Sequence, residues 1–238
     1  ATEDGALFVP RGRYLLSDVL ELRRGRVVIL GEDQAGAVLA FQRVLDDVRP
    51  RPAYAGRGEA GWSWEGGMIW VTGEDSNRHT LAEVTAPAER GSSTLRVSST
   101  SALKPGQLVE LVLTESEKSL RSYLHGDQFD YRLLPERRGH RELVRFVSRV
   151  RSVSDGAVTL DRPLRTDVRM HWRPRLCAPA PTVEEVGIER LTIEMPRRKY
   201  VRHWKEVGAN AIQFERVWNG WIRDVTIRNA DGGVFLEY

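Results

Sequence analysis

The chain has 238 residues, of which 41% are hydrophobic and 29% charged, so it can bury the core of one large domain or two small ones. Its 36 basic and 33 acidic residues nearly balance, which gives no reason to expect a nucleic-acid partner, whereas an acidic polymer fits the formal net charge of +3. No apolar run approaches the about 18 residues that a membrane span needs. Cys177 is the single cysteine, so no disulfide can form within the chain.

Short apolar runs, separated by Gly, Asn, Asp and Pro, follow one another along the first part of the chain. These runs are residues 7–9, 14–16, 19–22, 27–30 and 38–41. Their length and residue types are typical of strands. Helical periodicity is confined to residues 42–48 and 115–124, so the sequence predicts an all-β protein with two short helices.

Apolar patterns recur at a fixed spacing. The run 211–214 returns as 233–236, an offset of 22 residues, and the run 7–9 returns as 28–30, an offset of 21. A period of about 20–30 residues is typical of solenoid coils, which stack because no coil buries its inward face alone. The repeat therefore predicts a parallel β-helix, or solenoid. Alternation along its strands predicts that Ile212 and Phe214 point into the core and Gln213 points outward.

Residues 88–176 break this rhythm. Two of their apolar runs, 143–153 and 157–160, flank Asp155-Gly156, a pair that is typical of hairpin turns. We expect a small antiparallel β-barrel or sandwich here, inserted between a first part of the solenoid at 1–87 and its continuation at 177–238. Because bare solenoid ends expose backbone and core, we expect the rest of a longer chain or another subunit to cap both ends.

Three segments resemble one known family. Residues 5–14 are similar to the "LPPGTY" opening of pectate-lyase-like proteins, the pectin lyase superfamily, and residues 187–193 and 221–233 resemble its coils. The resemblance covers about residues 1–85 and 183–238. It implies a right-handed parallel β-helix that acts on polysaccharide outside the cell, so a secreted or cell-surface location is expected although no signal peptide opens this sequence.

The same resemblance leaves the activity open, because one fold serves many functions. It favours an enzyme, either a polysaccharide lyase or a glycoside hydrolase acting on an extended polysaccharide, acidic or neutral. Viral tail spikes share the fold. The alternative is therefore a non-catalytic glycan-binding or structural module of a cell surface or virion.

The densest polar cluster interrupts the coil between the runs 188–194 and 211–214. Its candidate catalytic residues are Arg202, His203, Lys205 and Glu206, and its candidate substrate-binding residues are Arg198, Tyr200, Trp204 and Asn210. Cationic side chains suit uronate carboxylates, a basic group can remove a proton in a β-elimination, and an indole can stack on a sugar ring. The alternative is a solvated loop with Trp204 packed on the solenoid wall.

Two further stretches are candidates. Residues 229–232 resemble the Asn-Thr-Asp-Gly motif of polygalacturonase-like hydrolases, which would make Asp231 a catalytic acid, although a glycosidase needs a second carboxylate and these residue types also favour a plain turn. Trp62 and Trp64 lie in the glycine-rich stretch 54–67 and suit either sugar stacking or loop anchoring.

No motif requires a cofactor. Asp127 and Asp130 can ligate Ca²⁺, but their spacing is not that of an EF-hand, and the five histidines do not have zinc-site spacing.

Overall fold

The computed structural model describes residues 4–51, 61–73, 78–128, 142–179, 182–200 and 202–237. The chain is all-β and divides into two compact units, one made of residues 1–76 and 180–238 and the other of residues 77–179. The second unit is wider than the predicted 88–176 because β7 (Thr80–Glu83) pairs with β12 (Arg175–Cys177). Within the described residues, no helix has the length and apolar character needed to cross a membrane.

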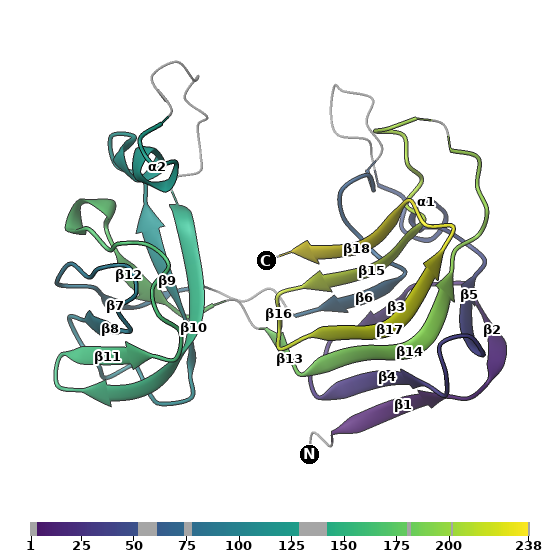
Figure 1. The fold of residues 1–238 in the computed structure, drawn as a ribbon, viewed down its shortest axis with the longest axis horizontal. Helices are drawn as coiled ribbons and strands as arrows, with labels where there is room; N and C mark the ends of the chain where they lie inside the picture. Colours follow the sequence, from purple (N-terminus) through teal and green to yellow (C-terminus); the bar gives the residue numbers. More distant parts are fainter. Residues whose placement is uncertain are drawn as a thin grey trace. The chain divides into compact units, whose positions relative to one another are not determined.

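Parallel strands build the first unit (Figure 1). One sheet contains β1 (Gly5–Val9), β2 (Gly12–Leu16), β4 (Val27–Gly31), β5 (Ala37–Phe41), β14 (Val186–Glu194) and β17 (Trp221–Arg228). A second sheet contains β3 (Leu20–Leu22), β6 (Ile69–Thr72), β15 (Asn210–Glu215) and β18 (Gly232–Glu237), and a short pair joins β13 (Val183–Glu184) to β16 (Val217–Trp218). Helix α1 (Leu45–Val48) follows β5, within the segment predicted to be helical.

The strand register confirms one predicted repeat and corrects the other. Ile212 pairs with Val234, which is the predicted offset of 22 residues. Leu7 pairs with Ile29 rather than with Val28, so the predicted offset of 21 is wrong by one residue. Because side chains alternate along a strand, a slip of one residue would exchange the two faces of β1. The observed spacing is 22 residues at both places.

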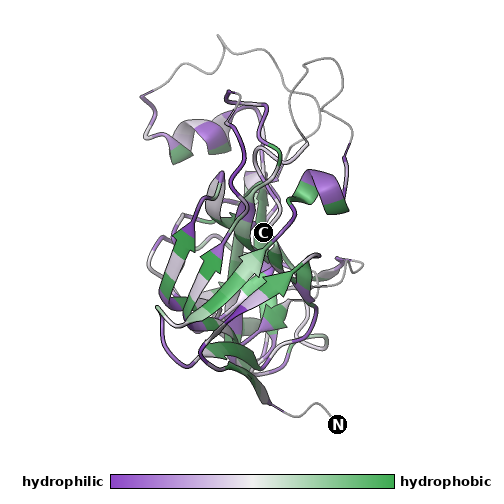
Figure 2. Ribbon diagram, turned by 90° about the vertical axis from the view of Figure 1, so that its right-hand side faces the viewer, coloured by the Kyte–Doolittle hydropathy of each residue, from purple (hydrophilic) through white to green (hydrophobic). Residues whose placement is uncertain are grey.

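The core of the first unit takes side chains from both large sheets. It includes the fully buried residues Ile29, Ile69, Ile188, Leu191 and Ile212. Burial of each such aliphatic side chain stabilises the fold by about 1.5–3 kcal/mol. Figure 2 shows the hydrophobic residues gathered on the strands, whereas the connecting segments are mostly hydrophilic.

Gln213 departs from the predicted alternation. It is fully buried, because residues 61–67 cover the face of β15 that was expected to meet solvent. Its side-chain oxygen accepts a hydrogen bond from the Gly66 N–H, and its amide donates to Glu237 Oε2 at 2.8 Å. Gly67 lies so close to the backbone of β15 that a Cβ would collide with it. These contacts fix the glycine-rich stretch onto the sheet.

Antiparallel strands build the second unit. Its six-stranded sheet has the order β7-β12-β9-β10-β11-β8, with β8 (Thr94–Arg96), β9 (Leu108–Thr114), β10 (Glu142–Ser154) and β11 (Ala157–Leu160). A bridge between Val84 and Val97 links the segments beside the two edge strands, so the sheet curls almost into a barrel. The pairing of Ser154 with Ala157 confirms the predicted Asp-Gly hairpin. Helix α2 (Ser119–Leu124) is shorter than the predicted 115–124.

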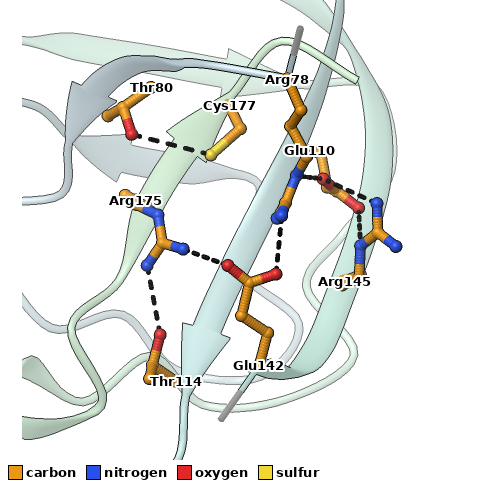
Figure 3. Close-up of polar contacts among 8 residues, drawn as sticks. All are labelled: Arg78, Thr80, Glu110, Thr114, Glu142, Arg145, Arg175 and Cys177. Carbon is orange, nitrogen blue, oxygen red and sulfur yellow. Dashed lines mark hydrogen bonds and ion pairs between the residues drawn. The ribbon is translucent and has the colours of Figure 1, made fainter. Parts of the chain in front are cut away.

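An arginine–glutamate network lies on the sheet of the second unit (Figure 3). Glu110 on β9 is fully buried and accepts hydrogen bonds from Arg78 Nε and Arg145 Nε, each at 2.6 Å. Glu142 accepts from Arg78 Nη1 at 2.6 Å and also from Arg175. A buried carboxylate of this kind is tolerated only while its cationic partners remain, so the network constrains the sheet strongly.

Candidate functional site

Three exposed aromatic side chains meet on the first unit. The ring centroid of Trp64 lies 4.4 Å from that of Trp204 and 5.4 Å from that of His203, and the His203 and Trp204 rings are 4.9 Å apart. Trp64 is 46% exposed and Trp204 40% exposed. Trp64 comes from the stretch fixed onto β15, and the other two come from the connection between β14 and β15. We call these three residues the aromatic cluster.

Glu206 holds the two segments of the aromatic cluster together. One carboxylate oxygen, Oε1, lies 2.8 Å from His203 Nδ1, and the other, Oε2, accepts a hydrogen bond from Ser63 Oγ at 2.7 Å. The side chain of Glu206 is only 10% exposed, whereas that of His203 is 57% exposed. The sequence predicted His203, Trp204 and Glu206 as site residues, but it carried no signal for Ser63, whose role depends on a contact across 143 residues.

The charge of Glu206 follows from these contacts. Burial raises the pKa of this carboxyl, but hydrogen bonds from Ser63, from its own backbone N–H and from His203 outweigh burial, so the pKa lies below its ordinary value. Glu206 is therefore an anion near neutral pH and favours the His203 tautomer with the proton on Nδ1. In neutral His203 this leaves Nε2 as an unprotonated nitrogen, on a side chain that is 57% exposed.

Acid should loosen this arrangement. Because the pKa of Glu206 is lower in the folded protein, its contribution to stability is complete above the unfolded value of about 4.3 and is lost as pH falls through the folded value. We expect residues 202–209 of the unchanged chain to lose protection against hydrogen exchange below about pH 4. The Glu206→Gln variant, measured at the same pH values, should lose much less. The exposed Glu89→Gln variant should keep the acid response. An equal acid response in Glu206→Gln would contradict this role.

Trp62 and Asn210 are buried and hold residues 61–67 in place. Trp62 is 1% exposed, and its Nε1–H donates to the carbonyl of Arg49 at 3.0 Å. Asn210 is also buried, and its Nδ2 donates to the carbonyls of Trp62 and Glu65 at 2.9 and 3.0 Å. Both side chains thus have contacts that position the stretch, and neither presents a free face to a ligand.

Asp231 lies at the turn between β17 and β18 and joins it to the start of β15. Its Oδ2 accepts the N–H of Ala209 at 3.0 Å, and its own N–H donates to the Ala209 carbonyl at 2.8 Å. This pairing corresponds to the turn that the sequence offered as the alternative to a catalytic acid. Arg198 is likewise engaged, since its Nη2 lies 2.7 Å from Oδ2 of Asp47 on α1.

The other predicted residues, Tyr200, Arg202 and Lys205, are exposed or half-buried. Tyr200 is 61% exposed, Arg202 is exposed and Lys205 is half-buried. In the described part of the chain, no side-chain hydrogen bond or ion pair joins these three residues to another residue. Tyr200 and Arg202 precede His203 in the chain, and Lys205 follows Trp204. Two of these three residues are cationic.

The predicted Ca²⁺ ligands are not brought together by the residues that the structure describes. Asp127 Oδ1 accepts a hydrogen bond from Ser122 Oγ at 2.7 Å, and Asp130 lies outside the described residues. Among the described His, Cys, Asp and Glu residues, no group of three or more is placed to hold a metal ion. Ca²⁺ binding stays a prediction.

These observations define an all-β protein whose first unit is built from parallel sheets. Its fold is similar to that of the tailspike protein gp49 from Pseudomonas phage LKA1, with a TM-score of 0.58 and 14% identity over 98% of this chain and 31% of that one. This chain therefore spans about a third of the length of that protein.

Two other tailspikes show weaker likeness. The Pseudomonas phage phi297 tailspike gp61 has a TM-score of 0.48 and 12% identity over 89% of this chain and 28% of that one. The Gp54 tailspike of Acinetobacter baumannii bacteriophage AP22, solved with A. baumannii capsular saccharide, has a TM-score of 0.44 and 10% identity over 96% of this chain and 39% of that one. No family model and no curated protein matches the chain.

Proposed function

We propose that this chain is part of a right-handed parallel β-helix, of the kind seen in pectate-lyase-like proteins, that binds an extended polysaccharide through the aromatic cluster. The 22-residue spacing of paired strands and the exclusively parallel pairing described in the first unit support the solenoid. The likeness to a phage tailspike supports it further. A location on a virion or cell surface is part of the proposal.

The observation that carries the proposal is the exposure of Trp64 and Trp204 side by side. Folded proteins rarely leave large apolar surfaces in contact with water unless those surfaces bind something. A sugar ring has an apolar face that can cover an indole, while its hydroxyls remain free for polar partners. The two rings come from separate segments locked together by Glu206, so the surface is preorganised for binding.

An acidic polysaccharide fits this surface better than a neutral one. Arg202 and Lys205 flank the aromatic cluster without side-chain partners among the described residues. Cationic side chains bind carboxylates through charge-assisted hydrogen bonds. Uronate sugars combine such a carboxylate with an apolar ring face and are the substrate class we propose.

Cleavage by β-elimination is a second proposal, favoured by the His203–Glu206 pair. His203 Nε2 would take the proton at C5 of a uronate. The electrons of that C–H bond would form the C4–C5 double bond as the C4–O bond breaks, and the leaving oxygen would take up a proton from water or from the His203 imidazolium. Hydrolysis is less favoured, because it needs a protonated acid and a second carboxylate, whereas Glu206 is an anion and Asp231 accepts a backbone N–H.

A panel of acidic and neutral polysaccharides tests both proposals. Binding is read by retention on immobilised polysaccharide, and turnover is read by new reducing ends and by ultraviolet absorbance of unsaturated products. We expect retention on a uronate polymer but not on neutral polymers. Absorbance together with reducing ends establishes elimination, reducing ends alone establish hydrolysis, and no retention by the folded chain contradicts the proposed function.

A further inference from the structure

A cavity on the second unit is lined by cations. It has a volume of about 370 Å³, is partly open to solvent, and is bordered by Arg90, Arg162, Pro163, Leu164 and Arg165. Among the described residues, this lining contains three arginines and no carboxylate. We call it the arginine cavity. Like charges that share one concave surface repel each other, and a bound anion relieves that repulsion.

The backbone fixes two sides of the arginine cavity. Residues 88–92 and 164–168 run antiparallel, because Ala88 and Val168 exchange hydrogen bonds of 3.1 and 2.7 Å. Leu164 closes the other end, since its carbonyl accepts from Gly91 at 2.9 Å and its N–H donates to Ser92 at 2.8 Å. Arg90 and Arg165 therefore reach the cavity from two segments that are held against each other.

The third arginine, Arg162, is held by contacts with β10. Arg162 Nη1 donates to the carbonyl of Val147 at 3.2 Å, and its guanidinium lies over the Phe146 ring, 5.3 Å from the centroid. A guanidinium that is already oriented loses little side-chain freedom when it binds a ligand. The arginine cavity thus has one fixed cation and two exposed ones.

Asp161 and Asp167, which are close to the lining in sequence, are engaged elsewhere, whereas Glu89 is exposed and has no side-chain contact among the described residues. Asp167 Oδ1 accepts the backbone N–H of Arg90 at 3.0 Å and Oδ2 lies 3.3 Å from Arg169 Nη2, while Asp161 lies 3.2 Å from Arg151 Nε. The guanidiniums of Arg90 and Arg165 have no side-chain partner among the described residues. Arg90 and Arg165 consequently offer guanidinium donors that no carboxylate in the lining satisfies.

We propose that the arginine cavity binds one anionic sugar residue through a carboxylate or phosphate group. Guanidinium forks match both groups with paired hydrogen bonds. The volume lies in the range of small-molecule sites, about 300–1,000 Å³, so it has room for a ring beside the anionic group. The arginine cavity belongs to the second unit, so this inference does not depend on the aromatic cluster.

Isothermal titration calorimetry of the whole chain tests the proposal with glucuronate, glucose 6-phosphate, glucose and inorganic phosphate. We expect saturable binding of at least one of the two anionic sugars and none of glucose. Arg90→Gln and Arg165→Gln should each weaken binding by about tenfold. Arg96→Gln, which removes an exposed cation of the same unit outside the cavity, should leave it unchanged.

The outcomes separate the sources of the anion. Binding of glucuronate, of glucose 6-phosphate or of both supports the proposal when Arg90→Gln and Arg165→Gln weaken it, and the sugars bound identify the anionic group. Binding of neither sugar overturns it. Binding of inorganic phosphate with no anionic sugar overturns it, as does unchanged affinity in both cavity variants when circular dichroism shows them folded. Because the arginine cavity and the aromatic cluster belong to different units, a Trp64→Ala variant should bind these small probes at the cavity normally even if the polysaccharide proposal fails.

Discussion

Trp204→Ala should lower the affinity for the polysaccharide by roughly thirtyfold, which corresponds to about 2 kcal/mol. The indole is 40% exposed, so its removal leaves the core intact and takes away stacking area and its contact with Trp64. Trp64→Ala should have a similar effect. Because the two rings touch, the double variant should lose less than the sum of the two. Equilibrium binding to the polysaccharide on which the chain is retained measures these losses.

Phe8→Ala is the matched control for this prediction. Phe8 is 55% exposed and lies on β1 of the same unit, but it contacts no residue of the aromatic cluster in any described ring pair. The Phe8→Ala substitution removes a comparable exposed ring, so the affinity of this variant for the polysaccharide should match that of the unchanged chain. An equal loss in Phe8→Ala and Trp204→Ala would show that general surface hydrophobicity, rather than this cluster, retains the protein.

Glu110→Ala should destabilise the second unit by about 3–5 kcal/mol. The substitution leaves Arg78 and Arg145 beside a cavity without the buried carboxylate that both hydrogen-bond. Without these contacts the sheet should open more often, so amide exchange along β9 should accelerate by about 150-fold or more. Hydrogen exchange followed by mass spectrometry measures this for residues 108–114 without a contribution from the first unit.

Glu142→Ala is the comparison that isolates burial. Glu142 also bonds two arginines, but its side chain is 29% exposed, so water can replace the lost contacts. Its loss should cost about 1 kcal/mol, near the upper end of exposed ion pairs. Equal effects of the two substitutions would mean that the network's worth does not depend on the burial of Glu110.

Local sequence patterns predicted the all-β class and several residues of the candidate site. The apolar run at 211–214 and its return at 233–236 predicted the pairing of β15 with β18. The interruption after β14 identified His203, Trp204 and Glu206, because polar and aromatic residues crowd a connection where the coil pattern stops. His203 and Glu206 are three residues apart, so their contact is short-range in sequence.

Contacts between distant segments explain what local patterns missed. Gln213 alternates like a surface residue, yet residues 61–67 return to cover it, and no periodicity within β15 signals that cover. Ser63 reaches the aromatic cluster in the same way, through a contact across 143 residues. Trp64 was a candidate from the sequence, but its contact with Trp204 was not predicted. The start of the second unit was placed too late because β7 pairs with β12, which lies almost a hundred residues further on.

Polysaccharide binding is tested most directly by a crystal structure of the chain with an oligosaccharide. The oligosaccharide is taken from the polysaccharide on which the chain is retained. The expected result is a sugar ring within about 4 Å of the Trp64 and Trp204 indoles, with its carboxylate toward Arg202 or Lys205. A sugar bound elsewhere on the first unit, with both indoles uncovered, would contradict the central proposal.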